Sequence, residues 1–334
     1  MTLREQTEER ERQTLSPFAS LSSASQGRLR PITPCEIRTC YQRDVDRIVH
    51  SKSFRRLMHK TQVFLQPEGD HYRTRMTHTL EVARISRTIA RGLSLNEDLT
   101  EAIALGHDLG HTPFGHAGER VLNQIMAGGF RHNEQSLRVV DRLENGGDGL
   151  NLCYEVRRGI LCHTGPDRAE TLEGQIVRLA DKIAYINHDI DDAMRGGIIY
   201  PLDIPLDISQ VLGFDHGGRI NTLVKDVIEA SQGKREICQS PACGSAMTRL
   251  RNFMFEAVYR NPRAKGEESK AQDMIARLFE YYQKDPDKLP PDYQDIRMRE
   301  GVDRAVCDYI AGMTDKYAVE KYCEAFIPLA WSVK

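Results

Sequence analysis

The segment from Gln175 to Met194 must pack against the rest of the chain along one side. At 100° per residue its large aliphatic side chains gather in one band, made up of Ile176, Leu179, Ile183, Ile186 and Ile190. Asp181, Tyr185 and Asp189 repeat every four residues on the opposite side. A helix of this kind buries its apolar band and leaves its polar side at an edge of the core. The segment therefore predicts a long helix with acidic residues on one face.

That acidic face has two interpretations. By itself, a row of charged side chains on a helix is more typical of solvated surface. Carboxylates on successive turns repel one another, however, unless a cation or hydrogen-bond donors lie between them. Both interpretations stay open until other residues of the chain are considered.

Helical patterns dominate elsewhere as well. Residues 75–93 carry apolar side chains at helical spacing, and Asn96 with two following acids is typical of a helix start. We expect that second helix to stop near Gly110. Alternating runs of Val, Ile and Thr, which are typical of strands, are scarce. The sequence predicts an all-α fold with short loops.

Composition narrows the class of protein. Lys and Arg number 46 and Asp and Glu 48, so the net charge is −2 and no overall basic excess indicates nucleic-acid binding. A local basic patch stays open. No apolar run reaches the ~20 residues needed to cross a bilayer, and the charged stretch from Met1 to Arg12 is not a secretory signal. Eight cysteines in such a chain indicate reduced thiols. We expect a soluble, cytoplasmic protein.

Histidines are concentrated in one part of the chain. Ten of the eleven lie between His50 and His188. A single histidine is more often a core or surface residue than a ligand, but residues 106–116 place His107, Asp108, His111 and His116 within ten positions. Three imidazoles and a carboxylate are costly to bury without partners, and metal coordination accounts for them economically. Imidazole mixed with carboxylate suits Mn²⁺, Fe, Co²⁺ or Mg²⁺ better than a structural zinc.

Other motifs are weaker. The pairs Cys35/Cys40 and Cys238/Cys243 do not match a zinc knuckle. The sequence has no Gly-x-x-x-x-Gly-Lys-Ser/Thr loop, so any phosphate binding is not of the P-loop kind. Arginines and lysines near the histidines would suit an anionic substrate, although ordinary surface charge explains them equally well.

Together these residues resemble a known family. His78, His107–Asp108 and Asp181 reproduce the H…HD…D order of the HD superfamily of metal-dependent phosphohydrolases. More narrowly, the chain resembles the deoxyguanosine triphosphate triphosphohydrolase family. The matching stretches cover most of the chain and include residues 15–19, 43–57, 60–64, 74–82, 106–119, 132–136, 179–185 and 308–315.

The resemblance implies roles for individual residues. The metal ligands would be His78, His107, Asp108 and Asp181, and the catalytic residues His111, His116 and Glu119. The nucleotide would be held by Gln62, Arg75, Lys182, Tyr185 and Asp189. Within that set, Arg75 and Lys182 would grip phosphate, and the other three would surround the sugar. The polar side of the helix over 175–194 would then face the metal and the deoxyribose.

The resemblance also implies an organisation. Residues 1–30, which are polar and rich in serine near Ser16 to Ser25, would form an N-terminal arm. Residues 31–334 would form a single helical HD phosphohydrolase domain, with the metal core at about 60–200 and a C-terminal helical part at about 201–334. We expect a homo-oligomer, with a nucleotide or single-stranded DNA as an open possibility for an effector and no membrane partner.

The activity implied is hydrolysis of a deoxynucleoside triphosphate, dGTP or several dNTPs, to a deoxynucleoside and inorganic triphosphate. We expect His116 to protonate the departing 5′-oxygen and Glu119 to orient it or to position water, with the acid and base roles among His111, His116 and Glu119 open. The chain is shorter than the longer dGTP-selective members, so the resemblance does not imply strict selectivity for dGTP, and the preferred dNTP is left open. The alternatives are another HD nucleotidase or phosphodiesterase, and a non-catalytic regulator that binds nucleotides or single-stranded DNA.

Overall fold

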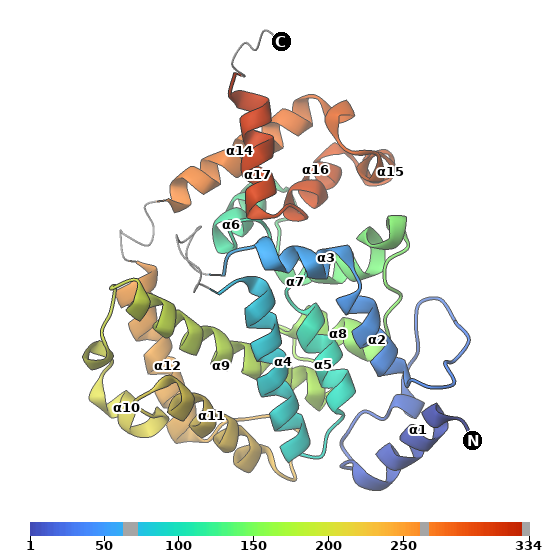
Figure 1. Cartoon of the computed structure of the whole chain (residues 1–334), viewed down its shortest axis with the longest axis vertical. Coiled ribbons are helices and arrows are strands. Elements are labelled where there is room, and N and C mark those ends of the chain that lie inside the picture. The colour runs from blue at the N-terminus through green and yellow to red at the C-terminus, as the bar shows by residue number, and fades with distance from the viewer. Residues whose placement is uncertain (63–72, 261–266, 329–334) are drawn as a thin grey trace, which may run out of the picture.

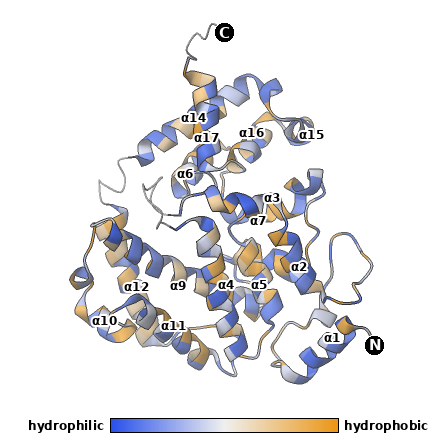
Figure 2. Ribbon diagram, viewed as in Figure 1, coloured by the Kyte–Doolittle hydropathy of each residue, from blue (hydrophilic) through white to orange (hydrophobic). Residues whose placement is uncertain are grey.

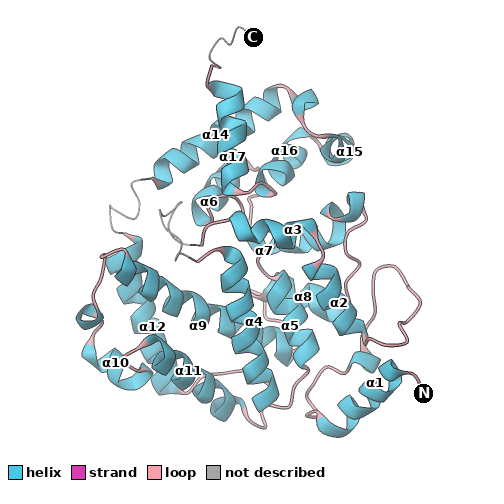
Figure 3. Cartoon of the chain, in the orientation of Figure 1, coloured by secondary structure: helices cyan, strands magenta, loops and turns pink. Residues whose placement is uncertain are grey.

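A computed structural model describes residues 1–62, 73–260 and 267–328. Within these ranges the all-α prediction is confirmed, because the only β-type pairings are two isolated bridges (Figure 3). The α-helices are α1 Leu3–Thr14, α2 Cys40–Val49, α3 Lys52–Arg56, α4 Arg75–Gly92, α5 Glu97–Gly106, α6 His116–Ile125, α7 His132–Arg138, α8 Tyr154–Cys162, α9 Leu172–Arg195, α10 Leu206–Leu212, α11 His216–Ser231, α12 Pro241–Met254, α14 Glu268–Lys284, α15 Pro291–Glu300, α16 Val302–Ala311 and α17 Asp315–Phe326. A π-helical turn, Phe255–Tyr259, continues α12.

Helix α9 lies inside the larger of two apolar cores. It packs against α4, α5 and α8, with α11 and α12 along its other flank (Figure 1). Four of the five aliphatic residues in its apolar band are buried, and Leu179 is partly buried against the same core. The long helix predicted for residues 175–194 is therefore confirmed and begins three residues earlier, after the N-cap Thr171.

A second apolar core joins the middle of the chain to its C-terminal part. Phe114, Phe130 and the apolar side of α6 pack with α14, α16 and α17. In Figure 1 these helices form the upper part of the molecule, although α6 lies about 150 residues before α14 in the chain. Figure 2 shows apolar residues on their inward sides and polar residues outside. The loop that leads into α6 therefore spans both cores.

Helix α5 ends earlier than expected. Asn96 caps its start as predicted, accepting the Leu99 N–H at 3.0 Å, but the helix stops at Gly106 rather than near Gly110. The Ser136 hydroxyl donates to the His107 carbonyl and accepts from the Gly110 N–H, at 2.6 and 2.9 Å. These bonds occupy backbone groups that a longer helix would use, so residues 107–110 form a turn.

The N-terminal residues fold back onto the larger core. Ser20 bonds to the buried carboxylate of Glu173 on α9, and Arg28 pairs with the buried Asp44 on α2. Helix α1 forms within the segment expected as an arm, and the division at residue 30 stays a prediction. None of the described helices has both the length and the apolar character that crossing a membrane requires.

Candidate metal centre and active site

Three segments bring together the four side chains that we expect to bind a metal. His78 lies on α4, His107 and Asp108 follow α5, and Asp181 lies on α9. His78 Nε2 is 3.1 Å from Asp181 Oδ1. His107 Nε2 is 3.3 Å from Asp108 Oδ1 and 3.8 Å from Asp181 Oδ1. The two-sided α9 explains the arrangement, since its apolar band fixes the helix in the core and Asp181 then faces α4 and α5.

The tautomer of His107 fits a metal ligand. Its Nδ1 lies 2.6 Å from the carbonyl oxygen of Ala104, which can only accept, so Nδ1 carries the hydrogen. The ring's Nε2 is buried, has no hydrogen-bond partner and faces two carboxylates. A metal bound through this nitrogen would also lie beside both carboxylates. Two imidazole nitrogens and two carboxylates therefore form a donor set that fits a divalent cation.

The local charges keep both carboxylates ionised. Burial opposes ionisation of Asp108, but His107, His111 and Arg75 hold its pKa well below the ordinary value. Burial also opposes ionisation of Asp181, whose pKa His78 and His107 lower. Arg75, expected to grip phosphate, is 2% exposed and its Nη1 lies 3.0 Å from Asp108 Oδ2. Its guanidinium thus contacts a metal-ligand carboxylate directly.

His111 lies beside the metal cluster as a neutral ring. Its Nε2 is 3.2 Å from Asp108 Oδ1. Burial and the positive charges of Arg75 and His132 lower its pKa well below the ordinary value. His107 and His111 therefore converge on Asp108, and a turn rather than a helix connects them.

His116 and Glu119 begin α6 and contact each other. His116 Nδ1 lies 3.1 Å from Glu119 Oε2, as their spacing predicts. The His116 side chain is 70% exposed, whereas that of Glu119 is 17% exposed. Bonds from His116 and His132 lower the pKa of Glu119 against the effect of burial. Glu119 is therefore an anion that holds Nδ1 of His116 and leaves its Nε2 accessible.

His132 is a site residue that the sequence analysis did not assign. Its ring and its backbone N–H both contact Glu119 Oε1, each at 2.9 Å. Its Nε2 lies 3.2 Å from Nε2 of His163, whose Nδ1 lies 2.7 Å from the Ile160 carbonyl oxygen. His163 thus carries its hydrogen on Nδ1 and accepts at Nε2, so His132 donates from both nitrogens. Burial opposes this cation, but Glu119 raises the pKa of His132.

The sequence held a signal for His132. It belongs to the clustered histidines and to the matching stretch at 132–136. Its contact with Glu119 could not be predicted from spacing, because the two residues are 13 positions apart and on different helices.

The residues expected around the nucleotide lie beside the cluster. Lys182, Tyr185 and Asp189 follow Asp181 along the polar side of α9. Asp189 is buried and accepts a hydrogen bond from the hydroxyl of Tyr259, which the sequence analysis missed. Burial raises the pKa of Tyr185 to about 12 and that of Asp189 to about 7. Gln62 is half-buried, and its Oε1 has no hydrogen-bond partner within the described residues.

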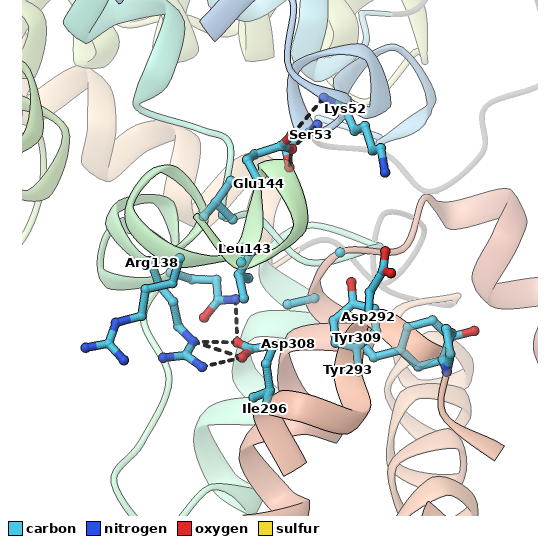
Figure 4. A pocket seen from close by; sticks show the side chains of 18 of the residues that line it. Lys52, Ser53, Arg138, Leu143, Glu144, Asp292, Tyr293, Ile296, Asp308 and Tyr309 are labelled. Atoms are coloured by element: carbon cyan, nitrogen blue, oxygen red, sulfur yellow. Dashed lines mark hydrogen bonds and ion pairs between the residues drawn. The ribbon is translucent and has the colours of Figure 1, made fainter. Parts of the chain in front are cut away.

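A separate cavity lies next to the turn at residues 109–110. Its volume is about 1110 Å³, and its lining includes Lys60 and Gly110 but none of the four metal-ligand residues. Figure 4 shows its mixed charge: Arg138 pairs with Asp308 on one side, and Glu144 accepts bonds from the start of α3 on the other.

Two family models match the chain. The HD domain matches residues 75–186, which include all four metal-ligand residues. The phosphohydrolase-associated domain matches residues 237–324.

Curated relatives match nearly the whole chain. A deoxyguanosinetriphosphate triphosphohydrolase-like protein of Caldanaerobacter subterraneus subsp. tengcongensis is 59% identical, over 99% of this chain and 98% of its own. A protein of the same name from Desulfatibacillum aliphaticivorans is 49% identical, over 98% and 99% of the two chains. Among solved structures, a phosphohydrolase from Bacteroides thetaiotaomicron matches 83% of this chain and 66% of its own, with a TM-score of 0.55. At 17% identity that likeness shows a shared fold.

Proposed function

The chain belongs to the deoxyguanosinetriphosphate triphosphohydrolase-like family of HD-domain phosphohydrolases, and we propose that it hydrolyses deoxynucleoside triphosphates to a deoxynucleoside and inorganic triphosphate. The observation that carries the proposal is one juxtaposition. A four-residue metal-ligand cluster lies next to the hydrogen-bonded group His116–Glu119–His132. The metal-ligand cluster suits the binding of a phosphoryl group. The group His116–Glu119–His132 suits the transfer of a proton to a poor leaving group.

His78, His107, Asp108 and Asp181 would hold the metal. When bound, a divalent ion lowers the pKa of water and polarises a phosphoryl oxygen. The residues of the chain then have to place the α-phosphate beside that cluster. Lys182, exposed on α9, would contact the phosphates, and Arg75 would add positive charge from behind Asp108.

The sugar would lie over the next turns of α9. Tyr185 presents a ring and Asp189 a carboxyl group at successive turns, and Gln62 has an amide oxygen still without a partner. A ring packed against the deoxyribose leaves little room for a 2′-hydroxyl. This arrangement would select deoxyribonucleotides over ribonucleotides.

The reaction breaks the bond between the α-phosphorus and the 5′-oxygen. The oxygen of water joins the phosphorus, and the 5′-oxygen leaves with the nucleoside and needs a proton. His116 would supply it from Nε2, because its Nδ1 is held by the Glu119 carboxylate. The cationic His132 holds the other oxygen of Glu119 and so fixes its orientation. A general acid in this place typically contributes ~10²–10⁴-fold.

Product analysis tests the proposal. The protein would be incubated with each of the four dNTPs and with Mn²⁺ or Mg²⁺, and the products separated by ion-exchange chromatography. Release of deoxynucleoside and triphosphate is the expected result. Orthophosphate or a nucleoside monophosphate would instead indicate a nucleotidase or phosphodiesterase of the same superfamily. Binding of nucleotide without turnover would indicate a regulator.

A further inference from the structure

Asp315 connects two separate segments of the active site. It is the first residue of α17, is 3% exposed and lies within the phosphohydrolase-associated region. Its Oδ1 accepts the backbone N–H of Phe114 at 2.9 Å. Its Oδ2 accepts the backbone N–H of Thr61 at 2.9 Å and the Thr61 hydroxyl at 2.7 Å. One buried carboxylate thus binds both segments.

Both segments lead directly to proposed site residues. Thr61 precedes Gln62, and Phe114 lies two residues before His116. The segments also touch each other, because a Cβ built on Gly115 would lie 3.5 Å from the carbonyl oxygen of Gln62. The position of Asp315 therefore fixes the spacing between Gln62, expected at the sugar, and His116, expected at the 5′-oxygen.

The backbone before His116 needs such support. Phe114 has φ +60° and Gly115 has φ +53°. A residue with a Cβ adopts this region only when its surroundings determine it. The Phe114 ring is held in the second apolar core, and its N–H is held by Asp315.

Lys60 strengthens the same junction. Its buried ammonium group donates to the carbonyls of His111 and Ala311, the latter at 2.9 Å. Residues 60–61, 111–114 and 311–315 are therefore bonded to one another around the catalytic loop. The C-terminal region makes direct contact with the backbone that carries His111 and His116.

We propose that Asp315 is a positioning residue for the hydrolytic reaction. Through Phe114 and Thr61 it sets the relative placement of His116 and Gln62, so the C-terminal region takes part in catalysis without touching substrate. The predicted effect of Asp315 on turnover rests on the proposed function. Its predicted effect on the backbone of residues 112–117 does not. A carboxylate is required because its two oxygens accept from two directions; an asparagine side chain of the same shape turns an NH₂ group toward one of those donors.

The test compares Asp315→Asn with Asp308→Asn. Asp308 is a matched control, because it is another buried carboxylate of the C-terminal region. It lies on α16 and accepts hydrogen bonds from Gln135 and Arg138 on α7. It makes no hydrogen bond to residues 111–116 in the described structure. Thr61→Val is a milder variant that removes only the hydroxyl bond to Asp315.

Hydrogen exchange followed by mass spectrometry measures the stability of the backbone hydrogen bonds at residues 112–117 without substrate. Asp315→Asn should speed exchange in peptides covering residues 112–117 by about tenfold or more, since the Phe114 N–H loses an ionised acceptor. Asp308→Asn should leave these peptides unchanged. Equal acceleration in both variants, or none in Asp315→Asn, would overturn the proposal. If Asp315→Asn does not fold, faster exchange at residues 57–62 in Thr61→Val supports it and unchanged exchange there overturns it.

Steady-state kinetics then measure the effect of each substitution on kcat. In the metal-loaded enzyme, Asp315→Asn should lower kcat ~10–100-fold and Thr61→Val less, with metal content unchanged. In a His116→Ala background, Asp315→Asn should lower kcat by a smaller factor than in the wild type, because only the placement of Gln62 is still affected. The positioning role would be contradicted if the effects of Asp315→Asn and His116→Ala on kcat were fully additive, or if Asp308→Asn lowered kcat by the same factor. A wild-type protein that releases no triphosphate defeats the proposed function alone, and hydrogen exchange still decides the role of Asp315.

Discussion

His78 Nε2 and Asp181 Oδ1 lie 3.1 Å apart, although 103 residues separate them in the chain. Burial lowers the pKa of His78, but the hydrogen bond and the charge of Asp181 raise it above the ordinary value. In the absence of a metal these residues form a partly buried ion pair. A bound cation would compete for the same atoms, so metal affinity should depend on pH.

The first prediction concerns the ligand set. Asp181→Ala should lose metal and turnover together, because the cluster keeps only three ligands. Metal content is measured by mass spectrometry of the purified protein, alongside kcat. Asp192→Asn, which changes a more deeply buried carboxylate on the same helix, should retain metal. Full metal occupancy in Asp181→Ala would show that Asp181 is not a ligand.

A second prediction concerns sugar selection by Tyr185. The wild type should have a higher kcat/KM for a dNTP than for the matching ribonucleotide. In Tyr185→Ala this preference should fall by ~10–200-fold, as expected when a pocket loses a close contact. Tyr185→Phe keeps the ring and should keep most of the preference. The account of the sugar site fails if the alanine variant discriminates as well as the wild type.

The third prediction separates chemistry from binding at His116. His116→Ala should keep its metal and still bind a non-hydrolysable dNTP analogue, while kcat falls ~10²–10⁴-fold. A metal ligand would instead lose metal, and a residue that only binds substrate would raise KM with kcat nearly intact.

A 5′-thio-linked dNTP provides the control for that role. A thiolate leaves without much protonation, so the variant should recover most of its deficit relative to the wild type on this substrate. Equal deficits on the oxygen- and sulfur-linked substrates would move the acid role to His111 or Glu119.

The fourth prediction concerns pH and stability. Burial raises the pKa of Asp189 to about 7, against about 3.9 in an unfolded chain. Between these values the folded protein binds more protons, so Asp189 makes stability fall as pH rises; the effect is absent below pH ~4 and complete above pH ~7.

Asp189→Asn removes this titration. The free energy of unfolding of the variant, relative to the wild type, should therefore increase from pH 5 to pH 8 by about 1–4 kcal/mol. Denaturant titrations after metal removal measure it, with the surface substitution Glu229→Gln as the control. A difference that stays constant over this range would show that Asp189 ionises normally.

Those parts of the site whose residues lie within one helix or one turn could be predicted from the sequence. The polar side of α9 and the pair His116–Glu119 follow from helical spacing, and the structure brings each together as expected. The C-terminus of α5 was predicted four residues too far along, because Ser136 takes backbone hydrogen bonds from another segment. No local pattern encodes that competition.

Contacts between distant segments could not be predicted in this way. His132 bonds to Glu119, Tyr259 bonds to Asp189 and Asp315 bonds to Phe114, each across a different pair of elements. The stretch at 308–315 was noted only as a resemblance, without a role for its last residue. The packing of the second apolar core shows why that carboxylate lies behind the catalytic loop.

Hydrolysis in water enriched with ¹⁸O shows which bond of the nucleotide the enzyme breaks. If water attacks the α-phosphorus, the label appears in inorganic triphosphate, and the 5′-hydroxyl of the deoxynucleoside keeps its original oxygen. Phosphorus NMR detects the labelled triphosphate and mass spectrometry the unlabelled nucleoside. Label in the 5′-hydroxyl, or in orthophosphate with a nucleoside diphosphate as the other product, would contradict the account.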